Sequence, residues 1–105
     1  MIKIVYRIKI KTGTEEEFRT LADKILIPLA TSLKGCILFS IFAPYTNKRE
    51  FIFYEIWESE DAVKSYYEEL IKALGPANPS DTFPKKLNNF IEEEEDILHE
   101  ESEAK

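Results

Sequence analysis

The sequence has very few of the residues that build metal centres and covalent cross-links. Its 105 residues include one cysteine, Cys36, and one histidine, His99. A single cysteine excludes an internal disulfide, and a single histidine excludes any metal site that needs two imidazoles. We expect Cys36 to be a small buried residue, because no neighbour in the sequence would lower the pKa of its thiol. We therefore predict that the protein holds no metal.

A phosphate-binding glycine motif, a long apolar run and an excess of positive charge are also missing. The three glycines, Gly13, Gly35 and Gly75, stand alone at expected turns or helix ends. No apolar stretch approaches the roughly 20 residues that cross a bilayer, and residues 2–10 alternate apolar and basic side chains, unlike a signal peptide. The net charge of −6 repels phosphate backbones. We therefore predict a cytoplasmic protein with no nucleic-acid partner, no membrane partner and no cofactor.

The composition that is present is that of one folded domain. Hydrophobic residues make up 44% of the chain and charged residues 32%, which is ordinary for a globular protein. A chain of 105 residues is too short for a second core. We expect one domain over residues 1–105, with a core over about 2–74. Residues 75–105 are expected to form a loop and an acidic C-terminal extension, as a helix or a strand.

Three segments read as strands and two as helices. Residues 2–10 alternate strictly, whereas 36–44 and 50–57 are nearly continuous apolar runs joined by a short connector rich in turn residues.

The first helix should begin at about Glu15 and end at Gly35 in a left-handed stop, with a kink or break near Ile27 caused by Pro28. The second helix should fill residues 59–75.

The C-terminal part is open to two interpretations. Residues 77–86 read as a loop because of their prolines and small polar residues. Residues 87–96 can then form a short helix with Leu87, Phe90 and Ile91 turned inward, followed by an edge strand over 96–102. The alternative is one continuous acidic helix. The acidic run 92–96 is expected to be a solvated face, because consecutive acids do not converge on a cation.

This order, β-α-β-β-α-β, predicts the ferredoxin-like α+β plan, an antiparallel sheet with both helices on one face. The strands over 36–44 and 50–57 are apolar on both sides, although two helices can cover only one side of a sheet. Monomers rarely expose an apolar patch larger than a few hundred Å². We therefore predict a homodimer in which a second copy covers the other face.

The sequence resembles the antibiotic biosynthesis monooxygenase family over about residues 2–74. The resemblance lies in "VYRIKIKTGTEEEFRTLADKILIPLATSLKGCILFSIF" and "EFIFYEIWESEDAVKSYYEEL", with their acidic helix start, the Gly-Cys before a strand, and Tyr-Glu-x-Trp-Glu-Ser leading into Glu-Asp-Ala. It implies a dimeric α+β barrel. It also implies an oxidoreductase, a cofactor-independent monooxygenase of a small aromatic substrate such as a quinol or polyphenol.

The resemblance also places a cavity between the sheet and the second helix, with Tyr6, Tyr66 and Trp57 as candidate substrate-binding residues and no assignable catalytic residue. Many members of the family carry a histidine where this chain has Tyr66. Tyrosine is a poor base because its ordinary pKa is about 10.

Two alternatives to the monooxygenase therefore stay open. The protein can be a non-catalytic ligand-binding or structural dimer, with the two tyrosines as core aromatics and Trp57 as a core or dimer anchor. Haem binding or degradation is less favoured, because the helix lacks the histidine and His99 lies beyond the proline-rich loop.

Overall fold

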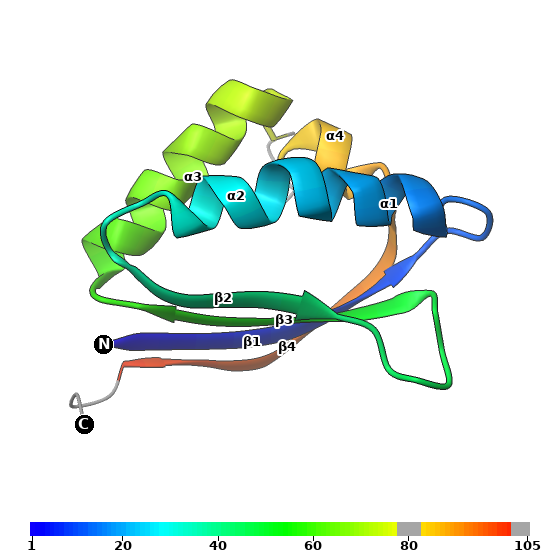
Figure 1. Cartoon of the computed structure of the whole chain (residues 1–105), viewed down its shortest axis with the longest axis horizontal. Coiled ribbons are helices and arrows are strands. Elements are labelled where there is room, and N and C mark those ends of the chain that lie inside the picture. The colour runs from blue at the N-terminus through cyan, green and yellow to red at the C-terminus, as the bar shows by residue number, and fades with distance from the viewer. Residues whose placement is uncertain (78–82, 102–105) are drawn as a thin grey trace.

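A computed structural model describes residues 1–77 and 83–101 of the chain (Figure 1). Four strands form one antiparallel sheet in the order β2-β3-β1-β4. Their bounds are β1 Ile2–Ile10, β2 Cys36–Phe42, β3 Glu50–Trp57 and β4 Ile91–Glu101. The helical segments all lie on one face of this sheet (Figure 1). The predicted α+β plan is therefore confirmed.

The helical segments are α1 Glu15–Leu21, η1 Ala22–Leu26, α2 Ile27–Thr31, α3 Glu60–Leu74 and α4 Lys85–Asn88. None of the helices in the described part of the chain is long and apolar enough to span a membrane. Part of the loop predicted over 77–86 falls in residues 78–82, which lie outside the described residues, as do residues 102–105.

The inner face of the sheet, which we define as the face toward the helices, holds the core. Side chains alternate along each strand, so every second residue of β1 and β3 points to the same side. On β3 the buried positions are Phe51, Phe53, Glu55 and Trp57. The helices complete the core with apolar residues that include Phe18, Leu26, Tyr66, Leu70 and Leu87.

The acidic C-terminal run forms a strand, not a helix. Residues 92–96 belong to β4, which pairs antiparallel with the basic strand β1. The Arg7 side chain contacts the Glu95 carboxylate at 3.2 Å, and the Lys9 ammonium lies 3.6 Å from the Glu92 carboxylate. Opposite charges on neighbouring strands favour this pairing over a solitary acidic helix. The expected edge strand is therefore present, but it begins at Ile91. The short helix expected over 87–96 was wrong in its bounds, since α4 ends at Asn88, and the continuous acidic helix does not form.

The helix after β1 does not break at its proline. Residues 15–31 stay helical, and the turn before Pro28 widens into the π-helical segment η1. A wider turn accommodates a residue that lacks an N–H group. The kink or break expected near Ile27 is thus replaced by this wider turn.

Gly35 was predicted to be a left-handed helix stop, and this was wrong. Only Gly13 and Gly75 have positive φ among the described glycines. Gly35 is needed for a different reason, since a Cβ at this position would overlap the Cβ of Ala62 on α3.

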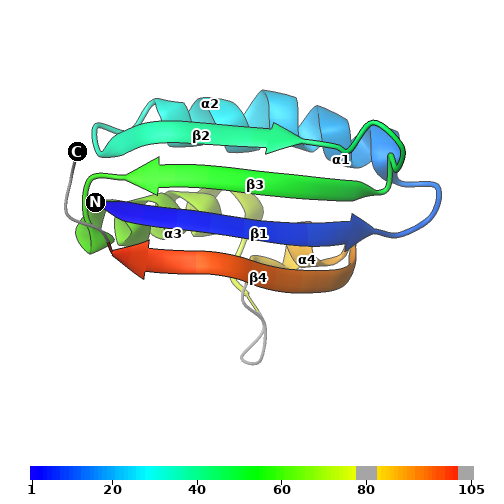
Figure 2. The same ribbon diagram turned by 90° about the horizontal axis from the view of Figure 1, so that it is seen from below.

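The outer face of the sheet, opposite the helices, is not covered by any element of the described chain (Figure 2). Its β2 and β3 half is apolar, with Leu38, Phe42 and Tyr54 each about two-fifths exposed. Its β1 and β4 half carries ion pairs, such as the one between Arg7 and Glu95. The bare face expected from the sequence is therefore present, and its apolar residues are concentrated on the β2 and β3 half.

Candidate functional site

A cavity of about 190 Å³ lies between the inner face of the sheet and helix α3. Its position follows from the fold, because α3 crosses the sheet above β1 and β3 (Figures 1 and 2). The lining residues come from five parts of the chain: Ile4 and Tyr6 of β1, Glu55 of β3, Val63, Tyr66, Tyr67 and Leu70 of α3, Phe83, and Asp96 and His99 of β4.

Tyr6 and Tyr66 both line this cavity, and aromatic neighbours fix both rings. The Tyr6 ring stacks on Phe53, with ring centroids 4.6 Å apart, and lies near Phe83. The Tyr66 ring stacks on Trp57, with centroids 5.1 Å apart. Two phenol hydroxyl groups from different elements are thus held in one apolar space. Their role in substrate binding stays a prediction.

Trp57, the third candidate, is not part of the cavity lining. Its side chain is fully buried behind Tyr66, and its indole Nε1–H donates a hydrogen bond of 2.8 Å to Oε1 of Glu55. Trp57 can therefore orient Tyr66 and Glu55, but in this structure it does not face a ligand in the cavity.

Glu55 is the residue that the sequence analysis missed. It is the only charged residue among the buried ones in the described chain, and its side chain is 4% exposed. The Trp57 indole and the Tyr6 hydroxyl both donate hydrogen bonds to its carboxyl group. A signal was available in the sequence, since "FIFYEIW" places Glu55 in phase with Phe53 and Trp57 on the buried side of an alternating strand.

The cavity shifts the ionisation of its acidic groups. Burial raises the pKa of Glu55 to about 7, although the hydrogen bonds from Trp57 and Tyr6 act in the opposite direction. Burial, followed by the charge of Glu55, also raises the pKa of the Tyr6 and Tyr66 hydroxyls above their ordinary range. Near neutral pH the tyrosines are therefore neutral hydrogen-bond donors, and Glu55 is the group that changes charge.

His99 lies in the cavity wall. Its position beyond the proline-rich loop made haem ligation through it less favoured, but β4 returns beside β1 and pairs His99 with Ile4. Its imidazole is 54% exposed, and its Nε2 is 3.9 Å from a carboxylate oxygen of Glu60 at the start of α3. Strand pairing between the chain ends, which the local sequence pattern did not specify, produces this placement.

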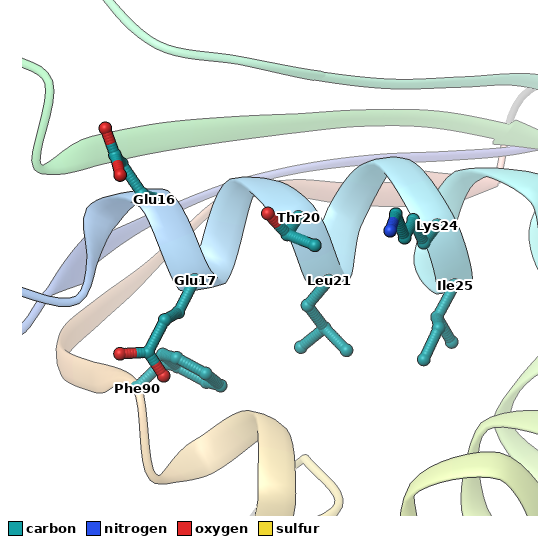
Figure 3. Close-up of a pocket in the computed structure, with 7 residues that line it drawn as sticks. All are labelled: Glu16, Glu17, Thr20, Leu21, Lys24, Ile25 and Phe90. Atoms are coloured by element: carbon teal, nitrogen blue, oxygen red, sulfur yellow. The ribbon is translucent and has the colours of Figure 1, made fainter.

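A larger hollow of about 520 Å³ lies on the surface beside α1 and η1 (Figure 3). Leu21 and Ile25 point into it from the helix, and Phe90 faces them from beyond α4 (Figure 3). Its charged and polar lining residues, Glu16, Glu17, Thr20 and Lys24, are all exposed. Because no buried polar group points into this groove, we place the candidate site at the smaller cavity.

No group of three or more histidine, cysteine, aspartate or glutamate residues is arranged to hold a metal ion within residues 1–77 and 83–101. Cys36 is a free thiol at partial burial, and burial raises its pKa. The chemically distinctive feature of the described chain is thus one buried carboxyl group between two phenols.

Comparison with known sequences gives one family and one curated relative. The sequence profile of the family described as "antibiotic biosynthesis monooxygenase" matches residues 1–68. An uncharacterised protein of Synechocystis is 30% identical over 67 residues, a match that covers 64% of this chain. The match spans 45% of that relative's length, so this chain corresponds to less than half of it.

Comparison with solved structures gives strong likeness in fold at low identity. A protein from Pseudomonas aeruginosa superposes with a TM-score of 0.74 at 11% identity, covering 98% of this chain and 94% of that chain. A mutant of SnoaB, a cofactor-independent oxygenase from Streptomyces nogalater, gives a TM-score of 0.68 at 12% identity, covering 99% and 94%. A conserved protein from Methanosarcina mazei gives 0.66 at 22% identity, covering 90% and 85%. Such identities establish the common fold.

Proposed function

The chain belongs to the antibiotic biosynthesis monooxygenase family, and we propose that it is a monooxygenase that oxidises a small electron-rich phenol with dioxygen and without a bound cofactor. The observation that supports this most is the cavity of about 190 Å³ in which two tyrosine hydroxyls and one buried carboxyl group converge. Such a site can hold a flat apolar ring and form hydrogen bonds to its phenolic oxygen.

The cavity volume favours a substrate with a single ring. Cavities that hold drug-sized ligands are roughly 300–1,000 Å³, whereas a cavity of about 150 Å³ accepts benzene. At about 190 Å³ the present cavity suits a substituted hydroquinone or catechol better than a polycyclic polyphenol. The same comparison disfavours haem as a resident group.

The proposed reaction needs no external reductant. A hydroquinone and dioxygen give a hydroxyquinone and water, so one oxygen atom enters the ring and the other leaves as water. The substrate supplies all four electrons that dioxygen accepts. The protein has to bind the ring, stabilise the phenolate through which electrons leave, and exclude bulk water. The fold that this chain shares with SnoaB, named as a cofactor-independent oxygenase, is compatible with that chemistry.

Residues of this chain would divide the binding work. Tyr66 is a neutral donor in the cavity and can donate one hydrogen bond to a substrate oxygen, whereas Tyr6 donates its single O–H to Glu55 and contributes its ring to the wall. Trp57 packs behind Tyr66 and keeps its ring in one orientation. Phe83 and Leu70 supply apolar wall.

We also propose that the active form is a homodimer, joined through the outer face of the sheet. The support is the exposed apolar half of that face, with Leu38, Phe42 and Tyr54. Two-fold pairing of these sheets would bury the apolar halves and give the barrel-like dimer expected from the sequence.

The function is tested by oxygen consumption and ¹⁸O₂ labelling with a panel of single-ring hydroquinones and catechols. We expect catalysed oxygen uptake above autoxidation, one labelled oxygen atom in the quinone product, and no loss of activity with chelators. Heat-denatured protein is the control for autoxidation. Activity only after addition of flavin, haem or metal would contradict the proposal. Tight binding of the same phenols without turnover would favour the non-catalytic ligand-binding dimer.

A further inference from the structure

We propose that the carboxylate of Glu55 is the proton acceptor of this site, which converts the bound phenol into the phenolate that reacts with dioxygen. This inference rests on the proposed function for the class of substrate, because it concerns the same cavity. It assigns a catalytic role to a residue of strand β3, whereas no catalytic residue could be assigned from the sequence.

The geometry leaves Glu55 able to take a proton from a ligand. Its carboxyl group lines the cavity and receives two hydrogen bonds, from the Trp57 indole and from the Tyr6 hydroxyl. An ionised carboxylate offers about four lone-pair positions, so further positions remain for a phenolic O–H. The two protein donors also hold the side chain in one place, as a base requires.

No side chain with a fixed positive charge lies beside the Glu55 carboxylate in the described part of the chain. The titratable groups that face it are Tyr6 from β1, Tyr66 from α3 and Cys36 from β2. Asp96 and His99 of β4 line the same cavity. No lysine or arginine lines the cavity in the described part of the chain.

A lysine or arginine beside Glu55 would make its carboxylate a weaker base. In the absence of one, burial raises the pKa of Glu55 to about 7. Glu55 is therefore ionised in part near neutral pH and still basic enough to accept a proton, the condition under which a general base works best.

The step is a proton transfer to Glu55, and Glu55 releases this proton at the end of the cycle. The phenolic O–H bond breaks, the proton moves to a carboxylate oxygen of Glu55, and the electron pair stays on the phenolate oxygen. The phenolate then passes electrons to dioxygen. When one oxygen atom leaves as water, it takes the proton held by Glu55 and a second proton that the substrate releases as the quinone forms, and the carboxylate is restored.

The first experiment compares Glu55→Gln with wild type in kcat/KM across pH. Glutamine keeps the size and the acceptor for the Trp57 N–H but cannot take a proton. General bases contribute at least about 100-fold, so we expect a loss of that order. Wild-type kcat/KM should rise with pH through an apparent pKa near neutrality, and the variant should lack this rise. Glu58→Gln, at an exposed position three residues on, is the matched control and should behave as wild type.

A merely structural role for Glu55 would lower activity but leave the shape of the pH profile unchanged. Equal rates and equal pH profiles in wild type and Glu55→Gln would overturn the proposal, and so would a lowered rate that keeps the wild-type rise. Circular dichroism and urea unfolding report whether the variant folds.

The second experiment needs no turnover, and its wild-type arm needs no variant. We would bind para-nitrophenol, an electron-poor phenol that resists oxidation, to the wild-type protein at a pH where the free ligand is ionised. Calorimetry in two buffers of different ionisation enthalpy then counts the protons exchanged. Binding an anion beside Glu55 should take up close to one proton per site, and Glu55→Gln should take up none. Binding without proton uptake by wild type would overturn the proposal.

These readouts separate this inference from the proposed function. Proton uptake with para-nitrophenol, together with no oxygen consumption by any hydroquinone, would leave Glu55 as a proton acceptor in a binding site and contradict the monooxygenase. Oxygen consumption that is unaffected by Glu55→Gln would support the monooxygenase and contradict Glu55 as its proton acceptor.

Discussion

Strand β3 carries two glutamates, on opposite faces of the sheet and in opposite settings. Glu50 lies on the outer face, where its carboxylate is 3.3 Å from the Arg7 guanidinium and both side chains stay partly exposed. Glu55 lies on the inner face, buried against aromatic rings and bonded only to neutral donors among the interactions found for it. A separation of five positions along the strand, an odd number, turns the two acids to opposite faces, which gives one a charged partner and the other an apolar cavity.

The same contrast applies to the two faces as wholes. The chain's own helices seal the inner face, so a charge there stays poorly solvated and its protonation becomes sensitive to pH. The outer face is open in the described chain, and its acids on β4 pair with the bases of β1 in contact with water. Chemistry is therefore expected on the inner face and association on the outer face. The following predictions are ordered by the size of the expected effect.

Leu38→Glu should break association at the outer face. The change places a charge in the apolar half of that face, where a partner would bury it without a counter-ion. We expect the dissociation constant of the dimer to rise by about 100-fold or more. Light scattering with size exclusion should give twice 12.3 kDa for wild type and 12.3 kDa for the variant. Tyr45→Glu is the control, since Tyr45 is fully exposed beyond the end of β2. A monomeric wild type at micromolar concentration would refute the dimer.

Glu55 should make folding stability fall as pH rises. Its pKa is raised from its ordinary 4.5 to about 7 in the folded protein. Its stabilising contribution is therefore fully present below pH 4.5 and is lost as pH rises through about 7. Relative to Glu55→Gln, the wild-type free energy of unfolding should fall by about 3 kcal/mol over this window. Urea titrations at one fixed protein concentration measure it. A constant difference between the two proteins across pH would contradict a raised pKa.

Tyr66→Phe should weaken the binding of a phenolic ligand without loss of fold. The substitution removes only the hydroxyl group from a ring packed on Trp57. Loss of one neutral hydrogen bond should cost about 0.5–1.5 kcal/mol of binding free energy. Calorimetric titration with para-nitrophenol measures it, and Tyr45→Phe at the surface is the control. If Tyr66→Phe unfolds the protein and Tyr6→Phe binds as wild type does, the two tyrosines are structural and the site assignment fails.

Glu95→Gln should have the smallest effect. This acid is paired with Arg7 at the exposed outer face, and exposed ion pairs contribute up to about 1 kcal/mol. We expect a loss of unfolding free energy within that limit, and a smaller loss at high salt. A loss well above about 1 kcal/mol would erase the contrast between the two faces.

The sequence predicted the elements well, because their signals are local. The bounds of β1 agree with its alternating pattern and those of β3 with its apolar run, and α3 begins after Ser59, whose hydroxyl accepts a hydrogen bond from the Ala62 N–H. The errors lie where distant contacts decide. Glycine is required at position 35 because α3 lies close to it. The acidic residues of β4 form a strand because they pair with the bases of β1.

The candidate site could be predicted in part for the same reason. Parity and helical spacing turn Tyr6 and Tyr66 inward, where both line the cavity, and their role in binding a substrate stays a prediction. Glu55 follows from the same parity but was overlooked, because an acid in a strand is read first as a surface residue. His99 could not be placed without knowing that β4 pairs beside β1, since its neighbours in sequence, two apolar residues before it and two acids after it, do not indicate which element it faces.

The central claim is that the fold buries one carboxyl group in an aromatic cavity and shifts its ionisation to near neutral pH. The most direct test is the carboxyl ¹³C chemical shift of the glutamates, followed by NMR as pH is raised. The account predicts one glutamate that titrates with a midpoint of about 7 and is absent from the Glu55→Gln spectrum. Titration of every glutamate below about pH 5, the range of exposed carboxyl groups, would contradict it.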